Sequence, residues 1–240
     1  MYICIAGKNE CAVNALKHLL LRKFKKSNIL VLPNNNDKGV DSWQPSLIKF
    51  AKKNNIKIIK IKNLYSLKRL FFFSLEYDKI INIKNFKSHN LFNFHFSLLP
   101  KYRGCHTNFL QIYKGEKFSG VTLHKIDSGI DTGDIIDKIK FRIKINDTAL
   151  DNYRKLMKFS TKLFKSNLNN IINDKYNLRK QILSNGLYFN RKSVNYKNKL
   201  NIIMNKSSLK KHNRIRSLIF PVYQLPLVNG VKVLKSVYKN

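Results

Sequence analysis

Short apolar runs alternate with segments of helical period in the first third of the chain, and this alternation restricts the fold more than any other feature. The runs typical of buried strands are residues 2–6, 28–33, 56–61 and 78–83. The segments with a helical spacing of apolar residues are 10–25, 45–53 and 64–75. Strands that alternate with helices predict an α/β fold with a mostly parallel sheet and right-handed crossovers.

The turn after the first strand is Gly7-Lys8-Asn9. It has neither the Gly-x-Gly-x-x-Gly pattern of a dinucleotide site nor a phosphate loop ending in Gly-Lys-Ser/Thr, so a dinucleotide is not expected. Lys8 and Asn9 fit two interpretations. They form a solvated turn, or they lie at the mouth of a site where the lysine meets a phosphate.

A further strand is predicted at residues 91–97, where polar and aromatic side chains alternate. The phenylalanines at 92, 94 and 96 form a core face, and Asn93 and His95 point the other way. Open α/β sheets place their chemistry at the C-terminal ends of strands. A histidine bonded to a backbone carbonyl is the ordinary alternative. The neighbouring amide and a second polar cluster downstream favour a functional role.

That second cluster occupies residues 119–136. Strands are predicted at 120–126 and 134–143, joined by a tight loop at 127–133 that contains two glycines. Asp127, Asp131 and Asp134 lie within eight residues of one another. The ligand spacing and terminal glutamate of an EF-hand are missing, so no metal is expected.

Together these two stretches resemble the formyltransferase family that uses 10-formyltetrahydrofolate. The family pattern Asn-x-His-x-Ser-x-Leu-Pro-x-Tyr-x-Gly matches residues 93–104. Its Gly-Val-Thr-x-His and Asp-Thr-Gly parts match residues 120–124 and 131–133. The resemblance covers about residues 1–180 and implies a Rossmann-like formyltransferase fold, with 10-formyltetrahydrofolate as co-substrate and no metal.

The resemblance also implies three groups of site residues. Catalysis is assigned to Asn93, His95 and Asp131. The folate side is assigned to Phe73, Leu75, Glu76, Tyr77, Gly129 and Ile130. The nucleotide-sugar side is assigned to Lys8, Asn9, Trp43, Arg103, Gly104 and Tyr223. Two ordinary alternatives remain, because the aromatic run at 71–73 also fits plain core and Trp43 also fits a packing anchor.

Formyl transfer to an amine needs a neutral amine, donors for the oxyanion and a proton for the leaving folate nitrogen. Imidazole exchanges protons near neutrality, so His95 is expected to act as general base. Asn93 offers an uncharged N–H donor to the oxyanion, and Asp131 is expected to act as the partner of His95. The division of roles between Asp131 and His95 comes from the resemblance.

Residues 181–240 are expected to form a C-terminal region after a catalytic domain of residues 1–180. A long helix capped at Thr148, with Asp151 as its capping partner, is expected to close the first domain. A polar helix is predicted within 200–219, and strands at 222–228 and 231–238 flank the hairpin signal Asn229-Gly230. A hairpin is marginal alone, so it should pack on the main domain or on another copy of the chain. Its apolar residues favour a homodimer built partly from this hairpin.

The length of the tail separates three branches of the family. Glycinamide ribonucleotide transformylases are shorter, and methionyl-tRNA formyltransferases carry a larger C-terminal barrel. The tail therefore favours sugar N-formyltransferases that act on dTDP-linked amino-dideoxy sugars for surface polysaccharides such as O-antigen. The expected substrate is dTDP-4-amino-4,6-dideoxyglucose or a related 3- or 4-amino sugar. A methionyl-tRNA formyltransferase-like enzyme and a basic nucleic-acid-binding protein remain alternatives.

The chain is strongly basic, with 47 Lys+Arg against 13 Asp+Glu and a net charge of +34. Nucleic-acid binding would explain this charge, and so would an AT-rich genome, which the abundant Lys, Asn and Ile favour. Three cysteines without paired ligand spacing indicate reduced thiols. No apolar run is long enough for a membrane span, and the N-terminus lacks the pattern of a signal peptide. We therefore expect a cytoplasmic protein without membrane or nucleic-acid partners.

Overall fold

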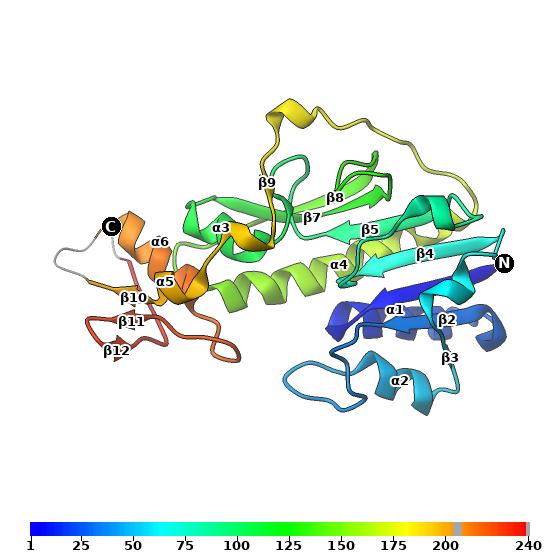
Figure 1. Ribbon diagram of the computed structural model, residues 1–240, viewed down its shortest axis with the longest axis horizontal. Coiled ribbons are helices and arrows are strands. Elements are labelled where there is room, and N and C mark those ends of the chain that lie inside the picture. The colour runs from blue at the N-terminus through cyan, green and yellow to red at the C-terminus, as the bar shows by residue number, and fades with distance from the viewer. Residues whose placement is uncertain (204–207, 239–240) are drawn as a thin grey trace. The chain divides into compact units, whose positions relative to one another are not determined.

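The computed structural model describes residues 1–203 and 208–238 (Figure 1). The chain forms two compact units. The first unit contains residues 1–95, 121–138 and 157–181. The second contains residues 96–120, 139–156 and 182 onward. The expected domain division at residue 180 stays a prediction, since the second unit also draws on two earlier segments of the chain.

A seven-stranded sheet forms the centre of the fold, in the order β3-β2-β1-β4-β5-β7-β8 (Figure 1). Its strands are β1 (Tyr2–Gly7), β2 (Ile29–Pro33), β3 (Lys57–Ile58), β4 (Leu70–Leu75), β5 (Leu91–His95), β7 (Phe118–Lys125) and β8 (Ile135–Arg142). The first five strands are parallel to one another, and β7 runs antiparallel to β5. This confirms the α/β fold with a mostly parallel sheet.

The helices of the first unit follow the expected pattern, except at residues 64–75. They are α1 (Asn9–Leu21), α2 (Leu47–Lys53) and α4 (Ala149–Ile172), which begins in the second unit, with short 3₁₀ turns at Lys26–Asn28, Ile61–Leu64 and Ile83–Asn85. The predicted cap of the long helix is confirmed. The Asp151 carboxylate accepts hydrogen bonds from the N–H and hydroxyl of Thr148, and the Thr148 hydroxyl accepts one from the Asp151 N–H.

The predictions of a helix at 64–75 and a strand at 78–83 were wrong. The aromatic run lies in the central strand β4, and residues 78–83 form the connection to β5. A short, continuous apolar run fits a buried strand as well as a buried helix, so its periodicity did not decide between them. Phe73 stacks on Phe92 of β5 at 5.4 Å between ring centroids and meets Phe164 of α4 edge-on at 5.2 Å. The plain-core interpretation of this run is the one its packing supports.

The strand predicted at 91–97 ends at His95, and both of its faces are covered. Phe92 and Phe94 are buried as expected. Leu91 and His95, from the opposite face, are buried too. A central strand of a parallel sheet is covered on both sides, so the simple division into one core face and one open face does not hold.

The second unit packs short elements around its own core. These are β6 (Arg103–Gly104), α3 (Thr107–Tyr113), β9 (Tyr188–Phe189), α5 (Tyr196–Leu200), β10 (Asn201–Ile202), α6 (Leu209–Leu218), β11 (Leu227–Val228) and β12 (Val231–Lys232), with 3₁₀ turns at Leu183–Asn185 and Arg191–Ser193. Residues 204–207 of the predicted polar-helix region lie outside the described residues. The core includes Tyr102, Phe109, Ile215 and Leu218.

The Asn229-Gly230 turn is present, but the hairpin is much shorter than predicted. Asn229 and Gly230 both have positive φ values, 47° and 81°, as a type I′ turn requires. Each strand contains two paired residues, and β11 also pairs with β10, which makes a three-stranded sheet. Before β11 the chain turns at Pro221, where the Phe220 N–H donates to the Gln224 carbonyl at 3.1 Å. This turn takes up the residues that were expected to extend the strand.

Candidate active site

The strand order itself marks one edge of the sheet as a place for ligands. From β1 the chain moves outward to β2 and β3, and then returns to β4 on the other side of β1. Open α/β sheets bind ligands outside the C-terminal ends of the two strands at such a reversal. Here those ends are Gly7 of β1 and Leu75 of β4, followed by the predicted site residues Lys8, Asn9, Glu76 and Tyr77.

The three predicted catalytic side chains meet in the first unit. His95 Nδ1 lies 3.3 Å from Asp131 Oδ2, and Asn93 Nδ2 donates to Asp131 Oδ1 at 3.2 Å. The side chains of His95 and Asp131 are 8% and 12% exposed. Because little solvent reaches them, charge interactions between them are screened less than at the surface. The structure therefore brings an amide, an imidazole and a carboxylate into one contact group.

His124 joins this group, although the sequence reasoning did not select it as a site residue. It lies on β7 directly opposite Asn93 of β5. Its Nδ1 lies 2.7 Å from the Lys125 carbonyl, which can only accept, so Nδ1 carries the proton. In the neutral ring Nε2 is then an acceptor, and it receives the Asn93 amide N–H at 3.1 Å. His124 is part of the matched motif, but its role depends on its position opposite Asn93, which the sequence alone does not give.

This contact pattern fixes the orientation of the Asn93 amide. If the amide were reversed, its oxygen would face two acceptors, His124 Nε2 and Asp131 Oδ1. With the nitrogen in that place, each of its two hydrogens has one acceptor. Both hydrogens of the Asn93 amide therefore have an acceptor within this group.

The loop that carries Asp131 is held by its own side chains and by Gln181. Asp131 has a φ of 55°, a left-handed conformation that Asp and Asn tolerate better than most residues. Thr132 donates its hydroxyl to the Asp127 carboxylate at 2.7 Å. The Gln181 amide donates to the carbonyls of Asp131 at 3.0 Å and Gly133 at 2.7 Å. A Cβ on Gly133 would lie 1.9 Å from the Lys125 carbonyl oxygen, so no other residue fits there without a shift.

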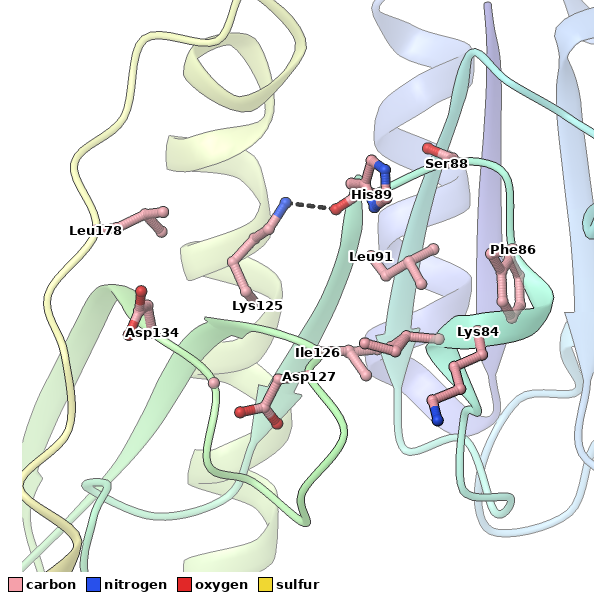
Figure 2. Close-up of a pocket in the computed structure, with 12 residues that line it drawn as sticks. Lys84, Phe86, Ser88, His89, Leu91, Lys125, Ile126, Asp127, Asp134 and Leu178 are labelled. Carbon is pink, nitrogen blue, oxygen red and sulfur yellow. Dashed lines mark hydrogen bonds between the residues drawn. The ribbon is translucent and has the colours of Figure 1, made fainter.

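A pocket of about 580 Å³ opens beside this loop (Figure 2). Its apolar walls come from Ile83, Phe86, Leu91, Ile126 and Leu178, and its polar lining includes Lys84, His89, Lys125, Asp127 and Asp134. Lys125 donates to the His89 carbonyl at 2.6 Å, as Figure 2 shows, and its ammonium lies 4.7 Å from the centre of the Phe92 ring. Burial lowers the pKa of Lys125, and the charge of Asp174 opposes this shift.

The other predicted site residues of the first unit fall into two groups. Asn9 donates its amide to Glu76 Oε2 at 3.0 Å, which links the ends of β1 and β4. Tyr77 is half-buried, and burial, followed by the charge of Asp78, raises its pKa to about 12. Phe73 and Leu75 are fully buried, in the backbone as well as the side chain. All five stay predictions as ligand contacts.

The remaining predicted residues lie elsewhere. Ile130 is exposed at the tip of the Asp131 loop, and Trp43 is half-buried in the connection before α2. Arg103 and Gly104 form β6 of the second unit, and Tyr223 is exposed in the turn before β11. A Cβ on Gly104 would lie 2.1 Å from the Phe189 carbonyl oxygen, so this glycine allows β6 and β9 to pair.

Across residues 1–203 and 208–238, no group of three or more His, Cys, Asp or Glu side chains could hold a metal ion. Within the same ranges, no helix is long and apolar enough to cross a bilayer.

Comparison with known proteins agrees with this geometry. The formyl transferase family model matches residues 75–168. The solved structure of WlaRD, a sugar 3N-formyl transferase studied with dTDP and 5-N-formyl-THF, is 51% identical with a TM-score of 0.96. The match covers 100% of this chain and 87% of that chain. The chain belongs to the formyltransferase family.

Two further relatives refine the position of this formyltransferase. The N-formyltransferase from Helicobacter canadensis, solved with folinic acid and dTDP-3-aminofucose, is 49% identical, with a TM-score of 0.93 over 98% of this chain and 87% of that chain. Methionyl-tRNA formyltransferase of Clostridium tetani is 33% identical over 75% of this chain. The chain spans about 62% of that enzyme's length. Similarity thus extends over nearly the full chain for the sugar enzymes and over part of it for the tRNA enzyme.

Proposed function

We propose that this formyltransferase moves the formyl group of 10-formyltetrahydrofolate onto the amine of a dTDP-linked amino-dideoxy sugar. The observation that carries the proposal is whole-chain similarity to two sugar N-formyltransferases, at 51% and 49% identity, combined with an assembled Asn93–His95–Asp131 group. One relative is described as a sugar 3N-formyl transferase and the other was solved with dTDP-3-aminofucose. These relatives shift the preference between the 4-amino and 3-amino substrates toward the 3-amino sugar.

The pocket beside the Asp131 loop is our candidate for the pterin ring of the folate. Its volume of about 580 Å³ lies within the range of small-molecule sites. Apolar side chains such as Phe86, Leu91 and Ile126 suit the faces of a flat ring, and the polar groups at its edge suit the ring nitrogens. Asp127 and Gly133, at the ends of the predicted folate loop with Gly129 and Ile130, also line it.

In the proposed reaction the neutral sugar amine attacks the formyl carbon. A carbon–nitrogen bond forms, and the carbonyl oxygen becomes an oxyanion. His95 takes a proton from the attacking nitrogen and returns one to N10 as the bond between N10 and the formyl carbon breaks. Asp131, 3.3 Å from His95 Nδ1, orients the ring and stabilises its protonated form. The formyl group is already activated on N10, so no metal is needed.

Asn93 supplies the oxyanion donor in this proposal, through an exchange of partners. Its two N–H groups donate to Asp131 and His124. An oxyanion is a stronger hydrogen-bond acceptor than a neutral imidazole nitrogen. We therefore expect the N–H that donates to His124 to donate to the oxyanion instead. A donor that binds charge only as it develops favours the transition state over the ground state.

The nucleotide side of the site is proposed from the predicted residues. Lys8 and Arg103 are candidates for the pyrophosphate, with Asn9, Trp43, Gly104 and Tyr223 as further contacts. Lys8→Ala should raise KM for the nucleotide sugar more than it lowers kcat, because a phosphate contact is equally strong in ground and transition states. Steady-state kinetics with varied nucleotide sugar checks this, and an unchanged KM contradicts it.

The decisive experiment incubates the protein with 10-formyltetrahydrofolate and a set of acceptors. Mass spectrometry should show the addition of one CO unit to a dTDP-3-amino sugar. The dTDP-4-amino sugars and methionyl-tRNA serve as comparison acceptors. Formylation of methionyl-tRNA in place of every amino sugar, or tight tRNA binding that falls steeply with salt, contradicts the proposal.

We further propose a homodimer, a cytoplasmic location and a role in surface polysaccharide synthesis. Exposed apolar side chains around the C-terminal sheet support the dimer; they include Val222, Tyr223, Val231, Leu234 and Val237. Exposed large apolar side chains gathered in one region of a chain are a common mark of an interface. Light scattering should give about twice the chain mass of 28.2 kDa, and a monomer at micromolar concentration contradicts it.

A further inference from the structure

Asn34 is the first of three consecutive asparagines, and its burial separates it from the other two. Its side chain is 2% exposed, whereas Asn35 and Asn36 are exposed. It follows directly after the last residue of β2. A buried side-chain amide is costly unless its donors and acceptor find partners, so the contacts of Asn34 have structural meaning.

Those contacts reach the segments that follow two other strands. The Asn34 N–H donates to the Gly7 carbonyl at the end of β1 at 3.1 Å. Its side-chain amide donates to the Glu76 carbonyl at 2.8 Å, and its side-chain oxygen accepts from the Asp78 N–H at 3.3 Å. In the sheet β1 lies between β2 and β4 (Figure 1). The Asn34 side chain, which follows β2, therefore reaches past the end of β1 to bond the loop after β4.

The loops that Asn34 joins are both held in costly backbone conformations. Asn9 and Glu76 have φ values of 61° and 62°. Left-handed backbone is unfavourable for a non-glycine residue, because its Cβ approaches the following carbonyl oxygen. Such residues persist where the surroundings hold them firmly, and they gather at functional sites. Here the Asn9–Glu76 hydrogen bond of 3.0 Å and the Asn34 contact with the Glu76 carbonyl supply that support.

We propose that Asn34 is a positioning residue that holds segments 7–9 and 76–78 in fixed register, so that affinity for both substrates depends on it. The inference rests on the proposed function, in which segment 7–9 borders the nucleotide sugar and segment 76–78 borders the folate. Asn34 acts through these two segments. The Asn93–His95–Asp131 group lies on β5 and the loop after β7, and it makes none of these contacts.

The test is Asn34→Asp, which keeps the size of the side chain but places an oxygen against the Glu76 carbonyl. Asn35→Asp and Asn36→Asp are matched controls with the same charge change at exposed neighbouring positions. Asn34→Asp should raise KM for the folate and for the nucleotide sugar together, each about tenfold, because a buried contact between two acceptors is unfavourable. The value of kcat with both substrates saturating should stay within about threefold of wild type.

A merely structural role gives a different pattern. If the substitution only reduces the fraction of folded molecules, apparent kcat falls and both KM values stay unchanged, and this overturns the proposal. KM values within twofold of wild type in a folded variant also overturn it. If Asn34→Asp does not fold, Asn34→Ser provides the same comparison with a smaller polar side chain.

A measurement without substrates separates this inference from the proposed function. Amide hydrogen exchange of residues 76–78 should be faster in Asn34→Asp than in Asn35→Asp. Equal exchange in the two variants overturns the positioning role, whatever the enzyme formylates. If wild type formylates no amino sugar, the proposed function fails, and the exchange comparison still decides the role of Asn34.

Discussion

Replacement of Asp131 by asparagine tests the arrangement of the catalytic group most directly. Asparagine has nearly the same size and tolerates the left-handed backbone at this position, where φ is 55°. The substitution removes the charge that faces His95 Nδ1 at 3.3 Å and one of the two acceptor oxygens. Because Asn93 Nδ2 donates to Asp131 Oδ1 at 3.2 Å, the orientation of the Asn93 amide is disturbed as well.

The size of the effect follows from these two contacts. A hydrogen bond to a charged group contributes about 1.5–3 kcal/mol, and asparagine removes the charge from both contacts and the acceptor from one of them, so the combined loss is at most about 3–6 kcal/mol. At about 1.4 kcal/mol for each factor of ten, kcat should fall by about 10²–10⁴. KM should change little, because the charge acts mainly on the transition state.

The assay measures initial rates of formyl transfer by mass spectrometry at saturating folate and amino sugar. Asp41→Asn is the control, since it makes the same change of charge at an exposed partner of Lys49 that belongs neither to the catalytic group nor to the pocket lining. Thermal unfolding of both variants checks that the fold is intact. A kcat for Asp131→Asn within threefold of wild type would refute the assignment of this carboxylate.

Three further outcomes are expected. His124→Phe, which removes the acceptor that orients Asn93, should lower kcat about tenfold with little change in KM, as measured by steady-state kinetics; an unchanged kcat would contradict the orienting role. Gly133→Ala should reduce thermal stability by about 1–3 kcal/mol and also lower kcat, because its methyl group meets the Lys125 carbonyl, and wild-type values in both assays would contradict the close contact. Burial lowers the pKa of His212 below its usual value of 6.5, opposed by the hydrogen bond to the Ile145 carbonyl and aided by the charge of Arg216. The unfolded chain therefore binds a proton at His212 more readily than the folded protein does, so the free energy of unfolding should fall as pH drops from 6.5 to the folded pKa. In this pH window His212→Gln should make the stability measured by urea titration less dependent on pH. An unaltered pH dependence would contradict the prediction.

The sequence predicted the elements whose periodicity was long and unmixed. The stripe of α1 and the cap of α4 at Thr148 are examples, because each depends on residues that are neighbours along one helix. The short run at 70–75 is different, since a buried strand and a buried helix present the same apolar surface over six residues. Only its pairing with β1 and β5 makes it a strand, and pairing is a tertiary property.

The candidate site could also be predicted only in part from the sequence. The motif residues Asn93, His95 and Asp131 could be selected from the chain because they stand in a recognisable order. The role of His124 depends on the register between β5 and β7, and that of Asn34 depends on three strands that are far apart in sequence. In the sequence, Asn34 is indistinguishable from the two asparagines after it. Burial, which a single sequence does not display, separates them.

Gln181 has a practical consequence for anyone who shortens or recombines this enzyme. A catalytic fragment cut after residue 180 would retain every member of the Asn93–His95–Asp131 group, yet it would lack the amide that fastens the carbonyls of Asp131 and Gly133. Such a fragment would contain the catalytic side chains, but the loop that carries Asp131 would be less firmly held. Chimeras that exchange C-terminal regions between relatives should therefore place their junction beyond Gln181, so that the Asp131 loop keeps its hydrogen bonds to the Gln181 amide.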